Sequence, residues 1–266
     1  MSVLIAIPAR FASTRYPGKP LVQLKGVGGV SRSLIERSWL AACAVSGADK
    51  VVVTTDDDRI RTACQGFGAE VVMTSSTCVN GTERCAEAHA ALGAGFDIVV
   101  NLQGDAPLTP HWFIEDLVAG LTAAPDAGVA TPVLRCDAAA LNGFLADRRA
   151  NRVGGTTAVF AGDKTALYFS KEVIPFTSEV YADGADTPVF HHVGVYAYRP
   201  DALAAYPNWP IGPLEQLEGL EQLRFMENGR KVLCVEVDAK GRQFWELNNP
   251  EDVTKIEAMM AEMGLE

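Results

Sequence analysis

Continuous apolar runs alternate with amphipathic stretches through the first half of the chain. Four runs predict strands, at residues 3–9, 51–57, 70–75 and 97–105. The first three are each followed by a segment in which apolar residues recur at helical spacing. Strands that are apolar along their whole length are typical of a parallel sheet covered on both faces. The first half therefore predicts an α/β fold, with a Rossmann-like, mostly parallel sheet and helices on both of its faces.

The second half shows a weaker pattern, in which shorter strands surround a polar loop at residues 178–188. The strands are expected at residues 168–170, 191–198 and 232–237. Leucines at three-residue spacing predict one helix over residues 214–228, and a last helix is expected over residues 250–263. This half is therefore expected to mix short strands with helices.

These patterns predict one domain with an insertion, because no repeat or long linker interrupts the chain. We expect an α/β core at residues 1–137. A smaller lobe at residues 138–210 would be inserted into the same domain. Residues 211–266 would then return to the core and end in the last helix.

The chain is acidic: 33 Asp and Glu residues against 23 Lys and Arg residues give its 266 residues a formal net charge of −10. This charge disfavours nucleic acid or an anionic membrane surface as the main partner. The N-terminal apolar run, residues 3–7, is far shorter than a signal-peptide core or a membrane-spanning helix. We therefore expect a cytoplasmic protein without membrane insertion. Six scattered cysteines lack metal-ligand spacing and predict reduced thiols.

The loop after the first predicted strand is basic. It carries Arg10, Arg15 and Lys19 within ten residues, together with Ser13 and Gly18. Such a loop suits a polyphosphate, because Arg forks match phosphate oxygens, Lys supplies a point charge, and backbone N–H groups are accessible. A solvated basic surface loop is the alternative. The acidity of the rest of the chain favours the phosphate site, although the loop does not match the P-loop pattern.

A second candidate lies at the end of the strand predicted at residues 97–105. Gln103, Gly104 and Asp105 follow its apolar part, at the edge where open α/β sheets bind ligands. A carboxylate that faces a polyphosphate requires a divalent cation between the two, most simply Mg²⁺. The alternative is an aspartate that opens a turn before Pro107. Taken alone, the residues support both interpretations about equally.

Three consecutive aspartates, Asp56, Asp57 and Asp58, close the second predicted strand. We interpret them as a solvated turn or a helix cap rather than as a metal site. The sequence ELNNPEDV, at residues 246–253, predicts the start of the last helix, with Asn249 as N-cap and Pro250 as first helical residue. Asn248 then lies just outside the helix, where its carbonyl oxygen can bind a ligand.

Several motifs occur in the order of one known family and span nearly the whole chain. They are IPARFASTRYPGKPL, NGTER, NLQGDAP, ALYFSKEVIP, HHVGVYAYR, PLEQLEGLEQLR and NPEDV. Together they resemble the CMP-Kdo synthetases, the 3-deoxy-manno-octulosonate cytidylyltransferases of the sugar nucleotidyltransferase superfamily. The resemblance implies that CMP passes from CTP to the anomeric hydroxyl of Kdo or a related 3-deoxy-ulosonic acid, with Mg²⁺ bound, for surface polysaccharide synthesis.

The resemblance also implies roles for individual residues. The nucleotide-binding residues would be Arg10, Ser13, Arg15, Lys19 and Arg84. The catalytic residues would be Lys19, Arg15 and Asp105. The metal ligands would be Asp105 and Asn248. The residues around the sugar acid would be Gln103, His192, Tyr196, Glu221 and Arg224. Structural interpretations of this last group stay open, because Glu221 and Arg224 can form a helix-surface ion pair and His192 can be a core histidine.

The chain departs from the family pattern at several positions. Where VDTPEDL carries an aspartate ligand, this chain has Asn248, whose uncharged amide oxygen can still coordinate Mg²⁺. QGDEP becomes QGDAP at Ala106, Asn80 replaces the serine before GTER, and a lysine is lost at Gly154. The change at Asn248 bears on metal affinity. The last three changes bear on the identity of the sugar acid and on the fine selectivity for the base, and they affect the phosphate chemistry less.

Two alternatives stand beside Kdo activation. The first is a paralogue that activates a different acidic sugar for a capsule or another surface glycan. The second is a catalytically weak, nucleotide-binding dimeric protein. In each case a homodimer is expected, because the insertion lobe resembles the dimerisation region of the family.

Overall fold

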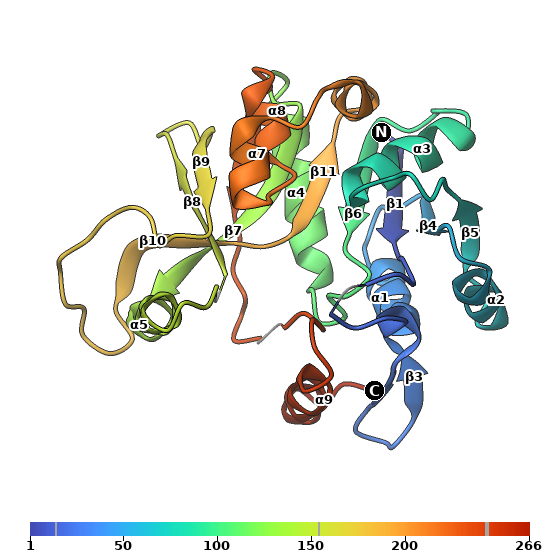
Figure 1. Cartoon of the computed structure of the whole chain (residues 1–266), viewed down its shortest axis with the longest axis horizontal. Coiled ribbons are helices and arrows are strands. Elements are labelled where there is room, and N and C mark those ends of the chain that lie inside the picture. Colours follow the sequence, from blue (N-terminus) through green and yellow to red (C-terminus); the bar gives the residue numbers. More distant parts are fainter. Residues whose placement is uncertain (14, 154, 243–244) are drawn as a thin grey trace. The chain divides into compact units, whose positions relative to one another are not determined.

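The computed structural model describes residues 1–13, 15–153, 155–242 and 245–266, so Gly154 lies outside the described residues. The chain forms two compact units (Figure 1). The first comprises Met1–Glu115 and Ala239–Glu266, and the second comprises Asp116–Asp238. The predicted insertion lobe falls within the second unit by residue number. Across the described part of the chain, no helix combines the length and the apolar character needed to cross a membrane.

The first unit is built on a parallel sheet, which confirms the predicted α/β class. Its main strands are β1 (Val3–Pro8), β4 (Lys50–Thr55), β5 (Glu70–Met73) and β6 (Ile98–Leu102). They lie in the order β5-β4-β1-β6, and each neighbouring pair is parallel. The first five residues of β1 and all of β6 are buried, which explains their continuous apolar pattern. The carboxyl ends of these strands share one edge of the sheet.

Short polar side chains begin the helices that pack on this sheet. These helices are α1 (Leu34–Cys43), α2 (Asp58–Gly66) and α3 (Gly81–Ala91). Ser33, Asp57 and Asn80 are their N-caps, and each side chain accepts a hydrogen bond from a backbone N–H of the first turn. Asp57 is therefore a helix cap, as one of the two sequence interpretations proposed.

In the rest of the first unit, the C-terminal segment packs against residues that follow β1. A short 3-10 helix, η1 (Lys19–Leu21), leads into the hairpin of β2 (Gln23–Lys25) and β3 (Ser31–Ser33), and α9 (Asp252–Glu262) packs against β2. One buried cluster joins these segments; its members are Leu24, Leu34, Leu108, Leu247, Ile256 and Met260. This core fixes Leu247, and with it the polar residues on either side, beside the N-terminal segments.

The second unit contains mainly antiparallel pairs. Its strands are β7 (Val129–Asp137), β8 (Thr156–Phe160), β9 (Ala166–Ser170), β10 (Asp186–His192), β11 (Val195–Tyr198) and β12 (Val232–Glu236). The antiparallel pairs are β7–β10, β7–β11, β10–β8 and β8–β9, whereas β12 pairs with β7 in parallel. The single strand predicted at residues 191–198 is thus two strands.

The predicted helix over residues 214–228 is wrong, because this segment forms two short helices. They are α7 (Pro213–Glu218) and α8 (Leu223–Glu227). Gly219 ends α7 with a φ of 63°, a left-handed conformation that glycine adopts without a Cβ penalty. The other helices of this part are α4 (His111–Ala123), which begins at the end of the first unit, α5 (Ala138–Arg149), α6 (Pro200–Ala205) and the 3-10 helix η2 (Tyr206–Asn208).

Candidate active site

The basic loop and Asp105 meet at the carboxyl edge of the first unit's sheet. Lys19, at the start of η1, donates from Nζ to Asp105 Oδ2 and forms an ion pair with it. The same Nζ donates to the carbonyl oxygen of Leu247 at 3.1 Å. Both charged side chains are largely shielded, with 14% and 24% of their surface exposed. Three segments far apart in the chain therefore converge on one ammonium group.

The turn that carries Asp105 is set by close packing beneath it. A Cβ on Gly104 would come within 2.7 Å of the Pro8 carbonyl oxygen, so the end of β6 approaches the end of β1 as closely as glycine allows. Ser38 of α1 also donates to the Gly104 carbonyl at 3.1 Å. These contacts hold the Asp105 carboxylate beside the basic loop.

The segment before α9 brings a second pair of polar groups to this edge. Arg15 Nη2 donates to Asn248 Oδ1 at 2.8 Å. The backbone N–H of Leu247 donates to the Asp105 carbonyl at 3.0 Å, which places Asn248 next to the Asp105 turn. Arg10 and Arg15 are exposed, and Ser13 Oγ accepts from the Tyr16 N–H at 3.4 Å. The loop cations thus stand where a phosphate chain can reach them.

Glu246 is a site residue that the sequence interpretation did not assign. Its Oε2 accepts from Asn248 Nδ2 at 3.5 Å. Desolvation of the carboxyl group, followed by the charge of nearby Asp105, raises the pKa of Glu246 above its usual range. Only its place in ELNNPEDV, two residues before Asn248, could have indicated it.

The donor atoms fit a magnesium ion shared with a substrate. Among the described residues, no group of three or more His, Cys, Asp and Glu side chains could hold a metal ion by itself. Asp105 and Asn248 offer a carboxylate and an amide oxygen, and each is bonded to a cation of the basic loop. Mg²⁺ often uses one or two protein oxygens and takes its other ligands from phosphates and water. This donor set therefore matches a metal that arrives with a nucleotide.

Asp252 holds the segment that carries Asn248 in place. Its Oδ2 accepts from the backbone N–H groups of Asn248 at 2.9 Å and Asn249 at 2.7 Å, and its Oδ1 accepts from Trp245 Nε1 at 2.9 Å. Burial opposes ionisation of Asp252, but these hydrogen bonds outweigh it and lower the pKa of the carboxyl group. The predicted helix start was two residues too early, because Pro250 and Glu251 form a turn and α9 begins at Asp252.

Replacing Asp252 with alanine should therefore loosen the Asn248 segment. Three donors would lose their acceptor, which costs about 1–3 kcal/mol of unfolding free energy where such donors are buried. Chemical denaturation measures this loss, and a magnesium titration of activity should show a higher half-saturating concentration. Glu251→Ala, which removes the neighbouring carboxylate that makes no capping bond, is the control. Equal magnesium dependence in the two variants would contradict this role of Asp252.

Arg84 lies at the same edge of the sheet and forms a buried ion pair. It extends from α3, pairs with Asp56 Oδ1 at 3.1 Å through Nη2, and donates from Nη1 to Thr74 Oγ1 at 2.7 Å. Asp56 and Thr74 follow β4 and β5 directly. The interpretation of Asp56 as a solvated turn residue is therefore wrong: it neutralises Arg84, whose side chain is 5% exposed.

Gln103 lies where the N-terminus of α3 meets the strand ends. A Cβ on Gly81 would lie 3.2 Å from Gln103 Nε2 and 3.0 Å from Asn101 Nδ2. Glycine at the first position of α3 thus permits this close approach. Gly81 of the NGTER motif and Gln103 of the QGD motif, 22 positions apart in the chain, are therefore neighbours in the folded first unit.

The remaining predicted substrate residues belong to the second unit. His192 is buried, and its Nε2 lies 2.8 Å from Thr131 Oγ1. Burial, followed by the neighbouring His191, lowers the pKa of His192 to about 3, so the ring is neutral. Tyr196 packs against His192, with ring centroids 5.7 Å apart, and donates its hydroxyl to Gln222 Oε1 at 3.0 Å. His192 and Tyr196 therefore belong to a buried aromatic cluster.

Arg224 is buried rather than exposed on a helix surface. Its Nε and Nη2 donate to the two carboxylate oxygens of Glu215 at 2.6 and 2.8 Å, and its guanidinium lies 4.1 Å from the Tyr206 ring centroid. The carbonyl oxygen of Glu221 accepts from the Tyr206 hydroxyl at 3.1 Å. The ion pair with Glu215 joins α7 to α8 across the break at Gly219.

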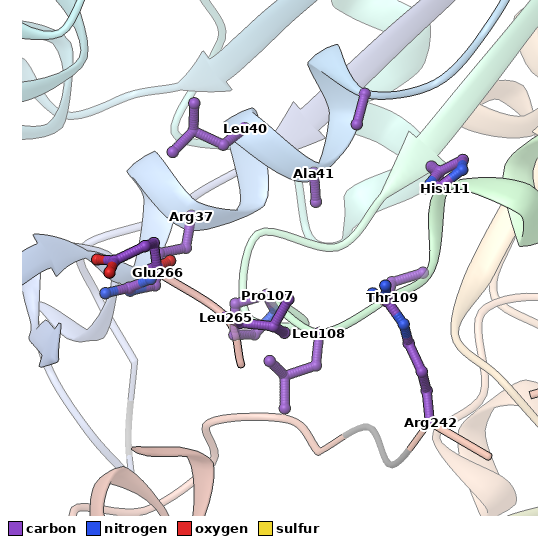
Figure 2. A pocket seen from close by; sticks show the side chains of 11 residues that line it. Arg37, Leu40, Ala41, Pro107, Leu108, Thr109, His111, Arg242, Leu265 and Glu266 are labelled. Atoms are coloured by element: carbon purple, nitrogen blue, oxygen red, sulfur yellow. The ribbon is translucent and has the colours of Figure 1, made fainter. Parts of the chain in front are cut away.

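A cavity of about 230 Å³ lies between α1 and residues 107–109 (Figure 2). Leu40, Ala41 and Arg37 of α1 form one wall, and Pro107 lies opposite them. Arg37 donates to the carbonyl oxygens of Leu24 and Val30, so its guanidinium is hydrogen-bonded to main-chain acceptors. None of the site residues predicted from the sequence, all of which are described, lines this cavity. It is therefore separate from the candidate site.

The chain matches known proteins along most of its length. The sequence model of the family described as "Cytidylyltransferase" matches residues 4–232. The chain is 44% identical over 264 residues to 3-deoxy-manno-octulosonate cytidylyltransferase of Maricaulis maris, with 99% of each chain covered. It is 38% identical over 263 residues to 8-amino-3,8-dideoxy-manno-octulosonate cytidylyltransferase of Shewanella frigidimarina, covering 98% of this chain and 99% of that one.

A solved structure extends the comparison to the fold. It is CMP:2-keto-3-deoxy-manno-octonic acid synthetase complexed with CTP, and it matches with a TM-score of 0.83 and 34% sequence identity. The match covers 99% of this chain and 100% of the other. The α/β fold predicted from the apolar runs is thus found in a related protein that binds CTP.

Proposed function

Because this chain belongs to the cytidylyltransferase family, we propose that it transfers CMP from CTP to the anomeric hydroxyl of Kdo or a closely related 3-deoxy-ulosonic acid, releasing pyrophosphate. The contact between Lys19 and Asp105 is the observation that carries the proposal, since it joins the basic loop to the carboxylate at the end of β6. The substrates in the names of the relatives support the choice of sugar acid.

The reaction is a displacement at phosphorus. The anomeric oxygen forms a bond to the α-phosphorus of CTP, the bond from that phosphorus to the bridging oxygen breaks, and its electron pair leaves with pyrophosphate. The hydroxyl proton passes to solvent. In such a transfer the protein mainly positions the reactants and neutralises charge. Arg10, Arg15 and Lys19 supply three positive charges for the triphosphate, and Lys19 is assigned to the leaving pyrophosphate.

The ion pair between Lys19 and Asp105 keeps both side chains at the site before CTP binds. Each side chain is largely shielded from solvent, and each would be costly to leave unpaired. A triphosphate offers Lys19 a stronger acceptor, so Lys19 can turn to it and expose the Asp105 carboxylate. Asp105 and Asn248 would then hold Mg²⁺. When bound, Mg²⁺ supplies a Lewis acid that neutralises phosphate charge and acidifies a coordinated hydroxyl.

Pyrophosphate release from CTP tests the proposed function and its alternatives. The purified chain is assayed with CTP and Mg²⁺ in the presence of Kdo, 8-amino-3,8-dideoxy-manno-octulosonate or N-acetylneuraminate, each in a separate reaction. We expect release with Kdo or its 8-amino analogue. Release with N-acetylneuraminate alone would indicate a paralogue for another acidic sugar. Absence of release with every acceptor, while CTP still binds, would support a catalytically weak nucleotide-binding protein and reject the transfer.

The Asn248 assignment leads to a prediction about the metal. Asn248→Asp restores a carboxylate and should lower the half-saturating Mg²⁺ concentration if this side chain coordinates the ion, because a charged oxygen binds Mg²⁺ more strongly. Asn249→Asp adds the same charge one residue away and is the matched control. Magnesium titrations of CTP turnover compare the two. Identical curves for Asn248→Asp and the unaltered chain would remove Asn248 from the metal's ligands.

We extend the proposal to a cytoplasmic homodimer. The use of CTP supports the compartment, because nucleoside triphosphates are made inside the cell. Exposed apolar side chains on the second unit support self-association: Phe176 is 90% exposed, Val180 is 99% exposed and Leu217 is 84% exposed. Light scattering should give twice the mass of the chain, and the mass of a single chain would contradict the dimer.

A further inference from the structure

The aromatic residue of the basic loop packs against an arginine of α2. Arg59 Cζ lies 3.4 Å from the centroid of the Phe11 ring, within the range of a cation–π contact. The same guanidinium donates to both carboxylate oxygens of Asp57, from Nε at 3.0 Å and from Nη2 at 2.5 Å. Asp57 is itself fixed as the N-cap of α2. The guanidinium plane is therefore oriented by the start of a helix.

Phe11 in turn holds the two ends of the basic loop together. Its carbonyl oxygen accepts from the N–H groups of Ser13 at 3.0 Å and Gly18 at 2.9 Å. The outer edge of its ring packs on Gly18, where a Cβ would lie 3.0 Å from Phe11 Cζ. Gly18 has a φ of 73° and directly precedes Lys19. Phe11 therefore contacts the residue that sets the direction of Lys19.

We propose that Asp57, Arg59 and Phe11 form a clamp that holds the basic loop in its triphosphate-binding conformation. Arg59 and Phe11 are positioning residues in this proposal, and neither contacts phosphate. The proposal rests on the proposed function, because it concerns the CTP site. A loop that gathers three like charges is ordered only at a cost in entropy and repulsion. Because the clamp orders the loop before CTP binds, less free energy is lost to ordering on binding, and the affinity for CTP increases.

Direct contact of Arg59 with phosphate is the competing explanation, since 62% of its side chain is exposed. The bidentate pair with Asp57 already balances the charge of Arg59, which favours the positioning role. Arg61 supplies a matched control. It lies on the same helix, has 42% of its side chain exposed, and pairs with Asp58 at 3.1 Å.

The test is a double-mutant cycle on CTP kinetics at saturating sugar acid. Phe11→Ala and Arg59→Ala should each raise the KM for CTP about fivefold, the scale of one exposed cation–π contact with its supporting pair. The kcat should stay within about twofold, because bound triphosphate itself organises the loop. The double variant should match the worse single variant. Phe11→Tyr, which keeps the ring, and Arg61→Ala should keep the KM of the unaltered chain.

Several results would overturn the clamp. If the KM of the double variant rose by the product of the two single increases, Arg59 and Phe11 would act independently. An unchanged KM in Phe11→Ala would show that the ring does not position the loop. Phe11→Leu removes the ring face with little loss of apolar volume and replaces Phe11→Ala if that variant does not fold. Absence of CTP turnover in the unaltered chain would instead reject the proposed function. Normal turnover there, with normal KM in the variants, would reject the clamp alone.

Discussion

Replacing Lys19 with alanine should lower kcat for CMP transfer by at least about a hundredfold, as expected for loss of one preorganised group that stabilises developing charge. The ammonium of Lys19 is held at the site by Asp105 and by the carbonyl oxygen of Leu247, so it is within reach of the triphosphate when CTP binds. Lys19 is the residue of the basic loop that forms an ion pair with the Asp105 carboxylate. Initial rates of pyrophosphate release at saturating CTP and sugar acid measure the effect.

The control for Lys19→Ala is Lys25→Ala, which removes the same charge from an exposed position at the end of β2. This variant should keep its kcat. Thermal unfolding of both variants separates a folding defect from a catalytic one. If Lys19→Ala had the same kcat as the unaltered chain, Lys19 would not stabilise the leaving pyrophosphate.

Asp105→Asn should reduce turnover by about a hundred- to a thousandfold, a loss comparable to removal of a key electrostatic group. Two effects act together. The carboxylate assigned to Mg²⁺ becomes an uncharged amide, and Lys19 loses its ion-pair partner. Raising the Mg²⁺ concentration should recover part of the lost activity, because an amide oxygen still coordinates the ion weakly. Rates measured over a magnesium series test both statements.

Asp126→Asn is the matched control, because Asp126 is an exposed aspartate whose replacement causes the same change in net charge. We expect its magnesium curve to overlay that of the unaltered chain. If Asp105→Asn also overlaid that curve, the assignment of Asp105 to the metal would be wrong. A large loss of activity with an unchanged magnesium dependence would show that Asp105 serves only to hold Lys19.

The parallel half of the fold could be predicted because strands that are buried on both faces are apolar along their whole length. The apolar run of β1 is the clearest case, since its residues from Val3 to Ile7 are buried in succession. The antiparallel half was harder. β7 was not predicted, and Pro132 interrupts its pattern, although the partners of β7 come from residues 186–236. Pairings across such distances in the chain leave no local periodicity to detect.

The break between α7 and α8 shows a different limit. Leucine spacing across residues 214–228 indicated one helix, whereas Gly219 adopts a left-handed conformation and ends the first one. Propensity alone penalises a glycine inside a helix by only about 1 kcal/mol. Tertiary contacts decide such cases, and here the buried pair of Arg224 with Glu215 stabilises the broken form.

The candidate site was partly visible for a topological reason. Parallel strands place the loops that follow them at one edge of the sheet, so the basic loop and Asp105 could be expected together. Their direct ion pair was not foreseen, because the sequence interpretation required a cation between Asp105 and the phosphates. The partnership of Asp56 with Arg84 and the three hydrogen bonds to Asp252 were also missed. Each depends on packing between segments that local spacing does not describe.

Diffraction from crystals of the protein with CTP and Mg²⁺ tests the central arrangement most directly. We predict triphosphate density between the basic loop and β6, with Lys19 Nζ within hydrogen-bonding distance of a phosphate oxygen and the ion on the Asp105 carboxylate. Nucleotide bound elsewhere, with the pair of Lys19 and Asp105 intact, would contradict it.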